Sequence, residues 1–158
     1  MNEKAMGIKN PKRRGEWAEL RFMAAAAENG LDVIRPWGDS AQYDFVVEHK
    51  ARFLRVQVKS TGFKSHGVYP CAVRGTQPRY LDHAWDFLAA YVVPEDLWYI
   101  IPWHIFDGQD SVELRPSMQT SKYAKYQGAW ELMKQALQIP TEPEEDLPPA
   151  SDGPTPPQ

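Results

Sequence analysis

The chain has 158 residues, of which 42% are hydrophobic and 25% are charged. This length and composition fit one globular domain with its own core and leave little room for a second. The single cysteine excludes an internal disulfide framework and a cysteine-rich zinc site, and it fits a reducing cytoplasm. Residues 1–10 lack the apolar region of a signal peptide. No stretch approaches the ~18 apolar residues that span a bilayer, so we expect a cytoplasmic protein without membrane contact.

The net charge of −3 is unevenly distributed along the chain. Residues 141–158 contain five acidic residues and no lysine or arginine, so the rest carries 18 basic against 16 acidic side chains, a net charge of +2. Basic residues gather ahead of the first predicted helix: Lys4, Lys9, Lys12, Arg13 and Arg14. A local patch matters more for phosphate binding than the total charge. The charge distribution therefore permits a nucleic-acid partner, although a solvated N-terminal arm explains it equally well.

In chain order, residues 1–11 are predicted to form a basic flexible arm. Apolar residues at three- and four-residue steps then predict a helix from Lys12 to Asn29, with Gly30 as its C-terminal cap. A strand follows over Leu31–Pro36, because Pro36 ends the extended run.

Two short strands, Tyr43–Val47 and Arg52–Lys59, are rich in β-branched and aromatic residues and are separated by a polar turn at residues 48–51, Glu-His-Lys-Ala. They predict a hairpin. If Glu48 pairs with Ala51, the antiparallel register places Asp44 opposite Arg55.

In this register Gln57 is the diagonal neighbour of Asp44, close enough for the two side chains to converge. Arg55, Gln57 and Lys59 share one face of the strand because side chains alternate, and the valines between them point into a core. One face thus gathers an acid, an amide oxygen and a lysine. That combination predicts an oxygen-ligand metal site with a cation beside it.

The second half of the chain predicts four more strands, at residues 68–73, 86–93, 97–101 and 112–115. Pro70 indicates an edge strand or bulge in the first of them. A helical pattern returns over Ser121–Leu137, and its aromatic stripe is expected to face the core rather than to stack on bases. Seven of the nineteen residues from Pro140 onward are proline, which predicts a disordered acidic tail over 139–158. The folded domain is then 12–138.

The hairpin resembles the core of the PD-(D/E)XK nuclease superfamily, in which an Asp at the start of a hairpin is followed by an acid-x-Lys triplet. Here Gln57 stands in place of the usual acid. Residues 15–19, Gly-Glu-Trp-Ala-Glu, resemble the glutamate-bearing first helix of that superfamily. The Gln triplet is most similar to the group I intron homing endonuclease branch. Archaeal Holliday-junction resolvases share the layout but carry an acid at the Gln position.

The resemblance covers residues 12–137 and implies an α/β, restriction-endonuclease-like fold, a mixed central sheet flanked by helices. It also implies a Mg²⁺-dependent DNA endonuclease. The implied metal ligands are Asp44, the Gln57 side-chain oxygen, the Val58 carbonyl and Glu19, with Glu16 as second choice to Glu19. Lys59 would orient the attacking water and offset developing negative charge.

Replacing the usual acid by Gln57 removes a negative charge from the site. Two unit charges 4 Å apart interact by about 4 kcal/mol at an effective dielectric of 20, so metal affinity should fall unless another carboxylate helps. This makes Glu19 more important here than in an acid-bearing relative. It also leaves open that the site does not turn over.

The predicted partner is double-stranded or branched DNA. The residues expected to contact it are Lys12, Arg13, Arg14, Ser60, Thr61 and Lys64. Cutting both strands needs two active sites, so a homo-oligomer is expected. Two alternatives remain open: a non-catalytic DNA-binding or assembly module on the same fold, and a Holliday-junction resolvase. The four histidines show no metal-type spacing, and Cys71 is expected to be a buried thiol rather than a nucleophile.

Overall fold

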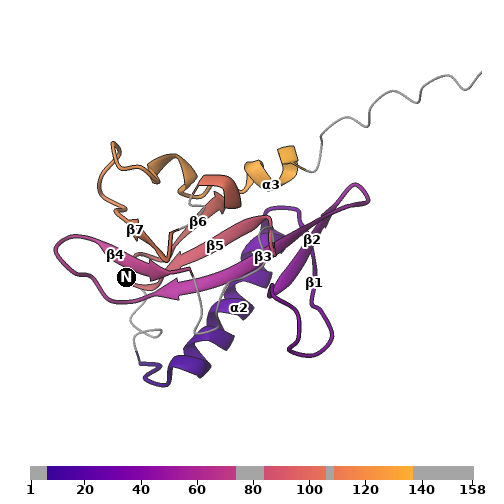
Figure 1. Ribbon diagram of the computed structural model, residues 1–158, viewed down its shortest axis with the longest axis horizontal. Helices are drawn as coiled ribbons and strands as arrows, with labels where there is room; N and C mark the ends of the chain where they lie inside the picture. The colour runs from indigo at the N-terminus through magenta and orange to yellow at the C-terminus, as the bar shows by residue number, and fades with distance from the viewer. Residues whose placement is uncertain (1–6, 74–83, 106–108, 137–158) are drawn as a thin grey trace, which may run out of the picture.

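A five-stranded sheet in the order β1-β2-β3-β5-β6 lies at the centre of the structure (Figure 1). The structure is a computed structural model that describes residues 7–73, 84–105 and 109–136. A second, two-stranded sheet pairs β4 with β7. The strands are β1 Asp32–Ile34, β2 Phe45–His49, β3 Arg52–Thr61, β4 Tyr69–Ala72, β5 Phe87–Val92, β6 Leu97–Pro102 and β7 Ser111–Leu114. The helices are α2 Pro11–Glu28 and α3 Glu131–Ala136, with 3₁₀ turns η1 Val93–Glu95, η2 Trp103–Ile105 and η3 Ala124–Tyr126.

The central sheet is mixed, as the sequence predicted. β3 pairs antiparallel with β2 and parallel with β5, and β5 pairs antiparallel with β6. Every residue of β5 is buried, which is typical of a central strand covered on both faces. The predicted strand at 112–115 forms β7, but within the described residues it pairs with β4 and not with the central sheet.

Helix α2 starts one residue earlier than predicted. Asn10 caps it, since its side-chain oxygen accepts a hydrogen bond from the backbone nitrogen of Arg13 at 3.2 Å. Pro11 occupies the first helical position, where its missing N–H costs nothing. Gly30, with a φ of +75°, follows the end of the helix as predicted.

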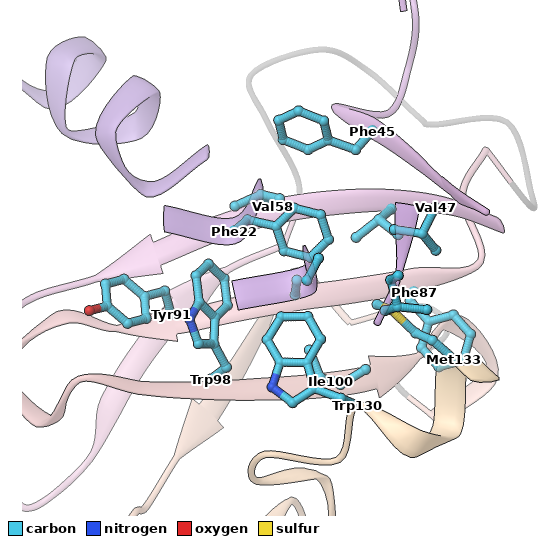
Figure 2. Close-up of a cluster of buried hydrophobic side chains, with 14 of the residues drawn as sticks. Phe22, Phe45, Val47, Val58, Phe87, Tyr91, Trp98, Ile100, Trp130 and Met133 are labelled. Carbon is cyan, nitrogen blue, oxygen red and sulfur yellow. The ribbon is translucent and has the colours of Figure 1, made fainter. Parts of the chain in front are cut away.

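Two hydrophobic clusters cover the two faces of the sheet. On the α2 face, the Phe22 ring packs within 5.3–5.8 Å of the rings of Phe45, Trp98 and Trp130 (Figure 2). On the opposite face, alternate residues of β5 and β6 pack against the β4–β7 sheet and the segment around η3. The central sheet is therefore the middle layer of the fold. The start of α2 lies beside Asp44 and the C-terminal half of β3.

The predicted hairpin forms, but its register differs by two residues from the prediction. His49 pairs with Arg52, so Val46 lies opposite Arg55. The turn is the two-residue loop Lys50–Ala51, with φ values of +51° and +60°, as in a type I′ turn. A shift of two residues leaves every side chain on its predicted face, because side chains alternate with a period of two.

The predicted helix from Ser121 to Leu137 is wrong. Gly128 has a φ of +61°, and Gln127 forms a β-bridge with Tyr99 of β6. The chain therefore makes only the turn η3 and the short helix α3, whose described part ends at Ala136. The aromatic stripe nevertheless faces the core, since its members Tyr123, Tyr126, Trp130 and Met133 are all buried.

No helix in the described part of the chain is long and apolar enough to cross a membrane. The predicted tail, 139–158, and most of the predicted arm, 1–6, lie outside the described residues.

Candidate active site

Asp44 is held at the start of the hairpin by three hydrogen bonds to β3. Its backbone nitrogen donates to the carbonyl of Val56 at 3.0 Å. Its Oδ2 accepts from Gln57 Nε2 at 2.5 Å and from the backbone nitrogen of Val58 at 2.7 Å. The predicted convergence of the Asp44 and Gln57 side chains is thus present in the structure, although Asp44 itself precedes the paired residues of β2.

The predicted site residues line one pocket of about 250 Å³ between the start of α2 and β3. Its walls are Pro11, Arg14, Gly15, Ala18, Glu19, Asp44, Gln57, Val58, Lys59 and Ser60. Gln57 and Lys59 alternate along β3 with Val56 and Val58, which belong to the core under α2. The pocket therefore brings together the acid, the amide, the lysine and the helix glutamate that are distant in sequence.

Of the two candidate glutamates on α2, Glu19 lines this pocket, whereas Glu16 is exposed and lines a separate hollow beside residues 7–10. Burial raises the pKa of Glu19, and the nearby Asp44 carboxylate raises it further. The Arg35 guanidinium opposes this effect and lowers the pKa. Glu19 is thus the glutamate placed to act together with Asp44.

Burial also raises the pKa of Asp44, and this effect outweighs the stabilisation that its carboxylate receives from the Val58 N–H, Lys59, Arg35 and Gln57. Asp44 and Glu19 consequently share a half-buried pocket in which holding two negative charges is unfavourable. A bound cation would relieve that cost, because opposite charge favours the ionised form of both groups.

The other two groups that the sequence predicts as metal ligands, the Gln57 amide and the Val58 carbonyl, also suit a hard cation. Gln57 is only 6% exposed, and its Nε2 lies 2.5 Å from Asp44 Oδ2 and 3.5 Å from the carbonyl oxygen of Val58. A positively polarised N–H group therefore sits against two of the oxygens that the sequence predicts as metal ligands. Two carboxylates with an amide and a backbone carbonyl match the oxygen ligands that Mg²⁺ accepts. Within the described residues, no group of three or more His, Cys, Asp or Glu side chains forms a richer metal site.

Arg35 is a site residue that the sequence analysis missed. It follows β1 directly, and its Nη2 lies 3.3 Å from Oε2 of Glu19. β1 pairs antiparallel with β2, with Ile34 opposite Val46, so the end of β1 comes close to the start of the hairpin. Arg35 lies outside the motif, and only this long-range pairing reveals it.

The predicted DNA-contacting residues divide into two groups. Arg14 and Ser60 line the pocket itself, and Lys12 and Arg13 are exposed in the same first turn of α2. Thr61 and Lys64 lie further along the chain. Lys64 Nζ is 3.8 Å from Oε1 of Glu95, so part of its charge is compensated.

Arg55 does not face Asp44, contrary to the predicted register. Its guanidinium binds both carboxylate oxygens of Asp86 at 3.0 and 3.2 Å, and its backbone nitrogen donates to Asp86 at 2.7 Å. This pair ties β3 to the start of β5. Cys71 is fully buried, and burial raises its pKa to about 12, so it is the inert thiol that was expected.

A mixed sheet of this order, with a helix glutamate facing an Asp and a Gln-x-Lys triplet across one pocket, defines a restriction-endonuclease-like protein. The family model described as PD-(D/E)XK endonuclease matches residues 9–133. The chain belongs to this family of nucleases. It is also similar to the solved structure of a bacterial homing endonuclease, I-Ssp6803I, with 28% sequence identity and a TM-score of 0.71 over 81% of this chain and 94% of that chain. No curated protein matches the chain.

Proposed function

We propose that this protein is a Mg²⁺-dependent DNA endonuclease of the homing-endonuclease-like type, which hydrolyses phosphodiester bonds at the pocket between α2 and β3. The observation that carries this proposal is the convergence of Asp44, Gln57, Lys59 and Glu19 on one pocket. Membership in the PD-(D/E)XK endonuclease family and the likeness to a homing endonuclease support it.

Asp44, Glu19, the Gln57 side chain and the Val58 carbonyl would hold the metal. When bound, Mg²⁺ would supply Lewis-acid polarisation of the phosphate and a more acidic water. The Gln57 amide would have to rotate so that its oxygen, rather than its nitrogen, points toward Asp44 and Val58. The short contact between Gln57 Nε2 and Asp44 Oδ2 would then be given up in exchange for a ligand bond.

Lys59 would act on the water and the phosphate rather than on the metal. It lines the same pocket, and its positive charge lowers the pKa values of Asp44 and Glu19. An ammonium group at this position can orient an attacking water and stabilise the negative charge that develops on the phosphate. The regular pairing of Lys59 with Ala90 of β5 places it on a rigid strand, which matters because a misplacement of about 1 Å can cost on the order of a hundredfold in rate.

Arg14, Ser60 and the exposed Lys12 and Arg13 would bind phosphates on either side of the scissile bond. Cutting both strands would require a second active site, so we expect the protein to act as a symmetric homo-oligomer. Cleavage of both strands at one locus, together with the mass of the protein–DNA complex in solution, would test this expectation.

The experiment that tests the proposal incubates purified protein with supercoiled plasmid and with a synthetic four-way junction, in Mg²⁺ or in chelator. Lys59→Ala removes the positive charge from the pocket, and Asp44→Asn keeps an acceptor for the Val58 N–H. The matched control is Lys134→Ala, which removes the same charge from α3, where Lys134 pairs with Glu131 at 2.7 Å.

We expect wild type and the Lys134 variant to cut DNA only in Mg²⁺, and both site variants to lose at least a hundredfold in rate with unchanged near-ultraviolet circular dichroism. Preference for the junction over plasmid would favour the resolvase alternative. DNA binding without cleavage in any metal would replace the endonuclease with a non-catalytic module.

A further inference from the structure

Phe63 is a large apolar side chain displayed to solvent beside the candidate active site. It follows the C-terminal end of β3 and is 72% exposed. Phenylalanine is usually buried, but a single exposed phenylalanine on a protein surface is common and needs no explanation by itself. The setting of Phe63 does need one, because the loop that carries it is held rigidly and borders the pocket.

The loop between β3 and β4 contains a tight two-residue turn. Ser65 and Val68 exchange both backbone hydrogen bonds, at 2.8 and 2.9 Å, across His66 and Gly67. These two turn residues have φ values of +48° and +82°. Figure 1 shows the loop projecting past the ends of β3 and β4.

The base of the loop is fixed to η1. Tyr69 donates its hydroxyl hydrogen to Glu95 Oε1 at 2.8 Å, and Lys64 Nζ lies 3.8 Å from the same oxygen and 5.2 Å from the centre of the Tyr69 ring. Phe63 is therefore presented on a preorganised loop, which lowers the entropy cost of using it to bind a partner.

A second hollow connects Phe63 to the candidate active site. It has a volume of about 370 Å³ and is lined by Thr61, Gly62, Phe63, Pro70, Ala72 and Val93 together with Arg14 and Ser60. Arg14 and Ser60 also line the pocket that contains Asp44, Gln57 and Lys59. The two hollows are thus adjacent, with Arg14 and Ser60 as the wall they share between the candidate catalytic residues and Phe63. The shared wall is basic and hydroxylated, which suits phosphates better than an apolar protein surface.

We propose that Phe63 is a DNA wedge, which inserts its ring at a base step close to the scissile phosphate and stacks on the exposed base. This inference rests on the proposed DNA-cleaving function. Apolar wedges such as phenylalanine partially unstack base steps, and one base–aromatic stack contributes enough to change affinity by about five- to a hundredfold or more. Phe63 lies four residues after Lys59, so their Cα atoms are at most about 14 Å apart. This backbone span corresponds to about four base pairs at 3.4 Å per pair, which places the wedged step close to the cut.

The test compares binding to a 30-base-pair mixed-sequence duplex with binding to the same duplex carrying a central three-nucleotide mismatch, by fluorescence anisotropy in Ca²⁺. Unstacking costs least at a mismatch, so wild type should bind the mismatched duplex about tenfold more tightly. Phe63→Ala should abolish that preference, and Phe63→Trp should retain it. The matched control is Phe53→Ala, which removes another exposed phenylalanine, at 59%, from the opposite end of β3.

The outcomes separate the inference from the function on which it rests. A wild type that binds neither duplex would remove the DNA function and the wedge together. A Phe63→Ala variant that keeps the mismatch preference, as Phe53→Ala is expected to do, would overturn the wedge and leave the endonuclease standing. Weaker self-association of Phe63→Ala in sedimentation, with the preference unchanged, would reassign the ring to a contact between copies of the chain. Lys59→Ala should keep the preference while losing cleavage.

Discussion

Alternate residues of strand β3 belong to two regions of opposite character. Val56 and Val58 enter the aromatic core under α2, whereas Gln57 and Lys59 face the pocket with Asp44. The core gains free energy by removing apolar surface from water. The pocket holds carboxyl groups whose pKa values are raised by burial, so its charges cost stability when no cation is bound. Strand β3 therefore carries both the valines that stabilise the fold and the polar residues that line the pocket.

The largest expected effect is on the core side. Phe22 is fully buried and contacts three other aromatic rings (Figure 2). Phe22→Ala should lower the free energy of unfolding by about 3–5 kcal/mol, the usual cost of deleting a buried phenylalanine side chain. Leu20→Ala on the exposed face of the same helix, where Leu20 is 62% exposed, should change it by less than about 0.5 kcal/mol. Urea denaturation measures both, and equal costs would contradict the assignment of the core.

Removing the two carboxylates of the pocket should stabilise the protein, whereas removing a core side chain destabilises it. Asp44 and Glu19 have folded-state pKa values above their ordinary values of 3.8 and 4.5. Their contribution favours folding at pH values below those ordinary values and is lost as the pH rises through the raised values. In chelator, the variant Asp44→Asn with Glu19→Gln should therefore become more stable than wild type as the pH rises above about 4.

Adding Mg²⁺ tests the same pair from the other side. A ligand that binds only the folded state raises its stability, so Mg²⁺ should raise the melting temperature of wild type and leave that of the double variant unchanged. If the stability difference between wild type and the double variant does not depend on pH, or if both respond equally to Mg²⁺, these carboxylates do not form a metal site.

The hairpin turn is expected to have a smaller effect on stability. Lys50 and Ala51 both have positive φ values, and this conformation costs an L-residue about 1–2 kcal/mol. Lys50→Asn with Ala51→Gly should raise the free energy of unfolding by about 1 kcal/mol. The gain is not larger because glycine loses more conformational entropy on folding than alanine does. The converse change, Gly67→Ala at a φ of +82°, should lower it by a similar amount. Denaturation midpoints with unchanged slopes would measure both, and a destabilised Asn–Gly variant would contradict the turn.

The smallest expected effect concerns Arg35. It pairs with Glu19 at 3.3 Å, but its side chain is 62% exposed, so the pair contributes only about 0.2–1 kcal/mol. Arg35→Ala should free Glu19 for a cation and tighten Mg²⁺ or Ca²⁺ binding up to about fivefold, as measured by calorimetry. Arg35→Lys should stay near wild type. Weaker metal binding in Arg35→Ala would show that Arg35 positions Glu19 rather than competing with the cation.

The sequence predicted which side chains lie together at the pocket better than it predicted the register of the hairpin that carries them. The alternation along β3 and the Asp at the start of the hairpin were sufficient to bring Asp44 and Gln57 together. Pairing Glu48 with Ala51 placed the two-residue turn at His49–Lys50, one residue too early, because Lys-Ala carries none of the Asn-Gly or Asp-Gly signal that marks a type I′ turn. The error did not reach the site, since a shift of two residues preserves the faces.

Other errors have a different cause, which is tertiary pairing. The aromatic spacing over 121–137 correctly predicted which side chains are buried, yet the β-bridge from Gln127 to Tyr99 and the positive φ of Gly128 stop a continuous helix. The spacing of apolar residues along the chain predicts which side chains are buried. It cannot predict that a residue of a distant strand, here Tyr99, will pair with the segment and interrupt the helix. Arg35 was missed for the same reason, because only the pairing of β1 with β2 brings it to Glu19.

The parallel pairing of β3 with β5 also bears on the order in which the chain assembles during synthesis. Val56 pairs with Phe87, which leaves the ribosome 31 residues later. The β2–β3 hairpin can form from local contacts soon after it is made, but one edge of β3 then presents unpaired N–H and C=O groups until β5 is available. At about 5–20 residues per second this interval lasts on the order of seconds. The strand that carries Gln57 and Lys59 thus keeps one edge open to pairing with other chains until β5 has been made.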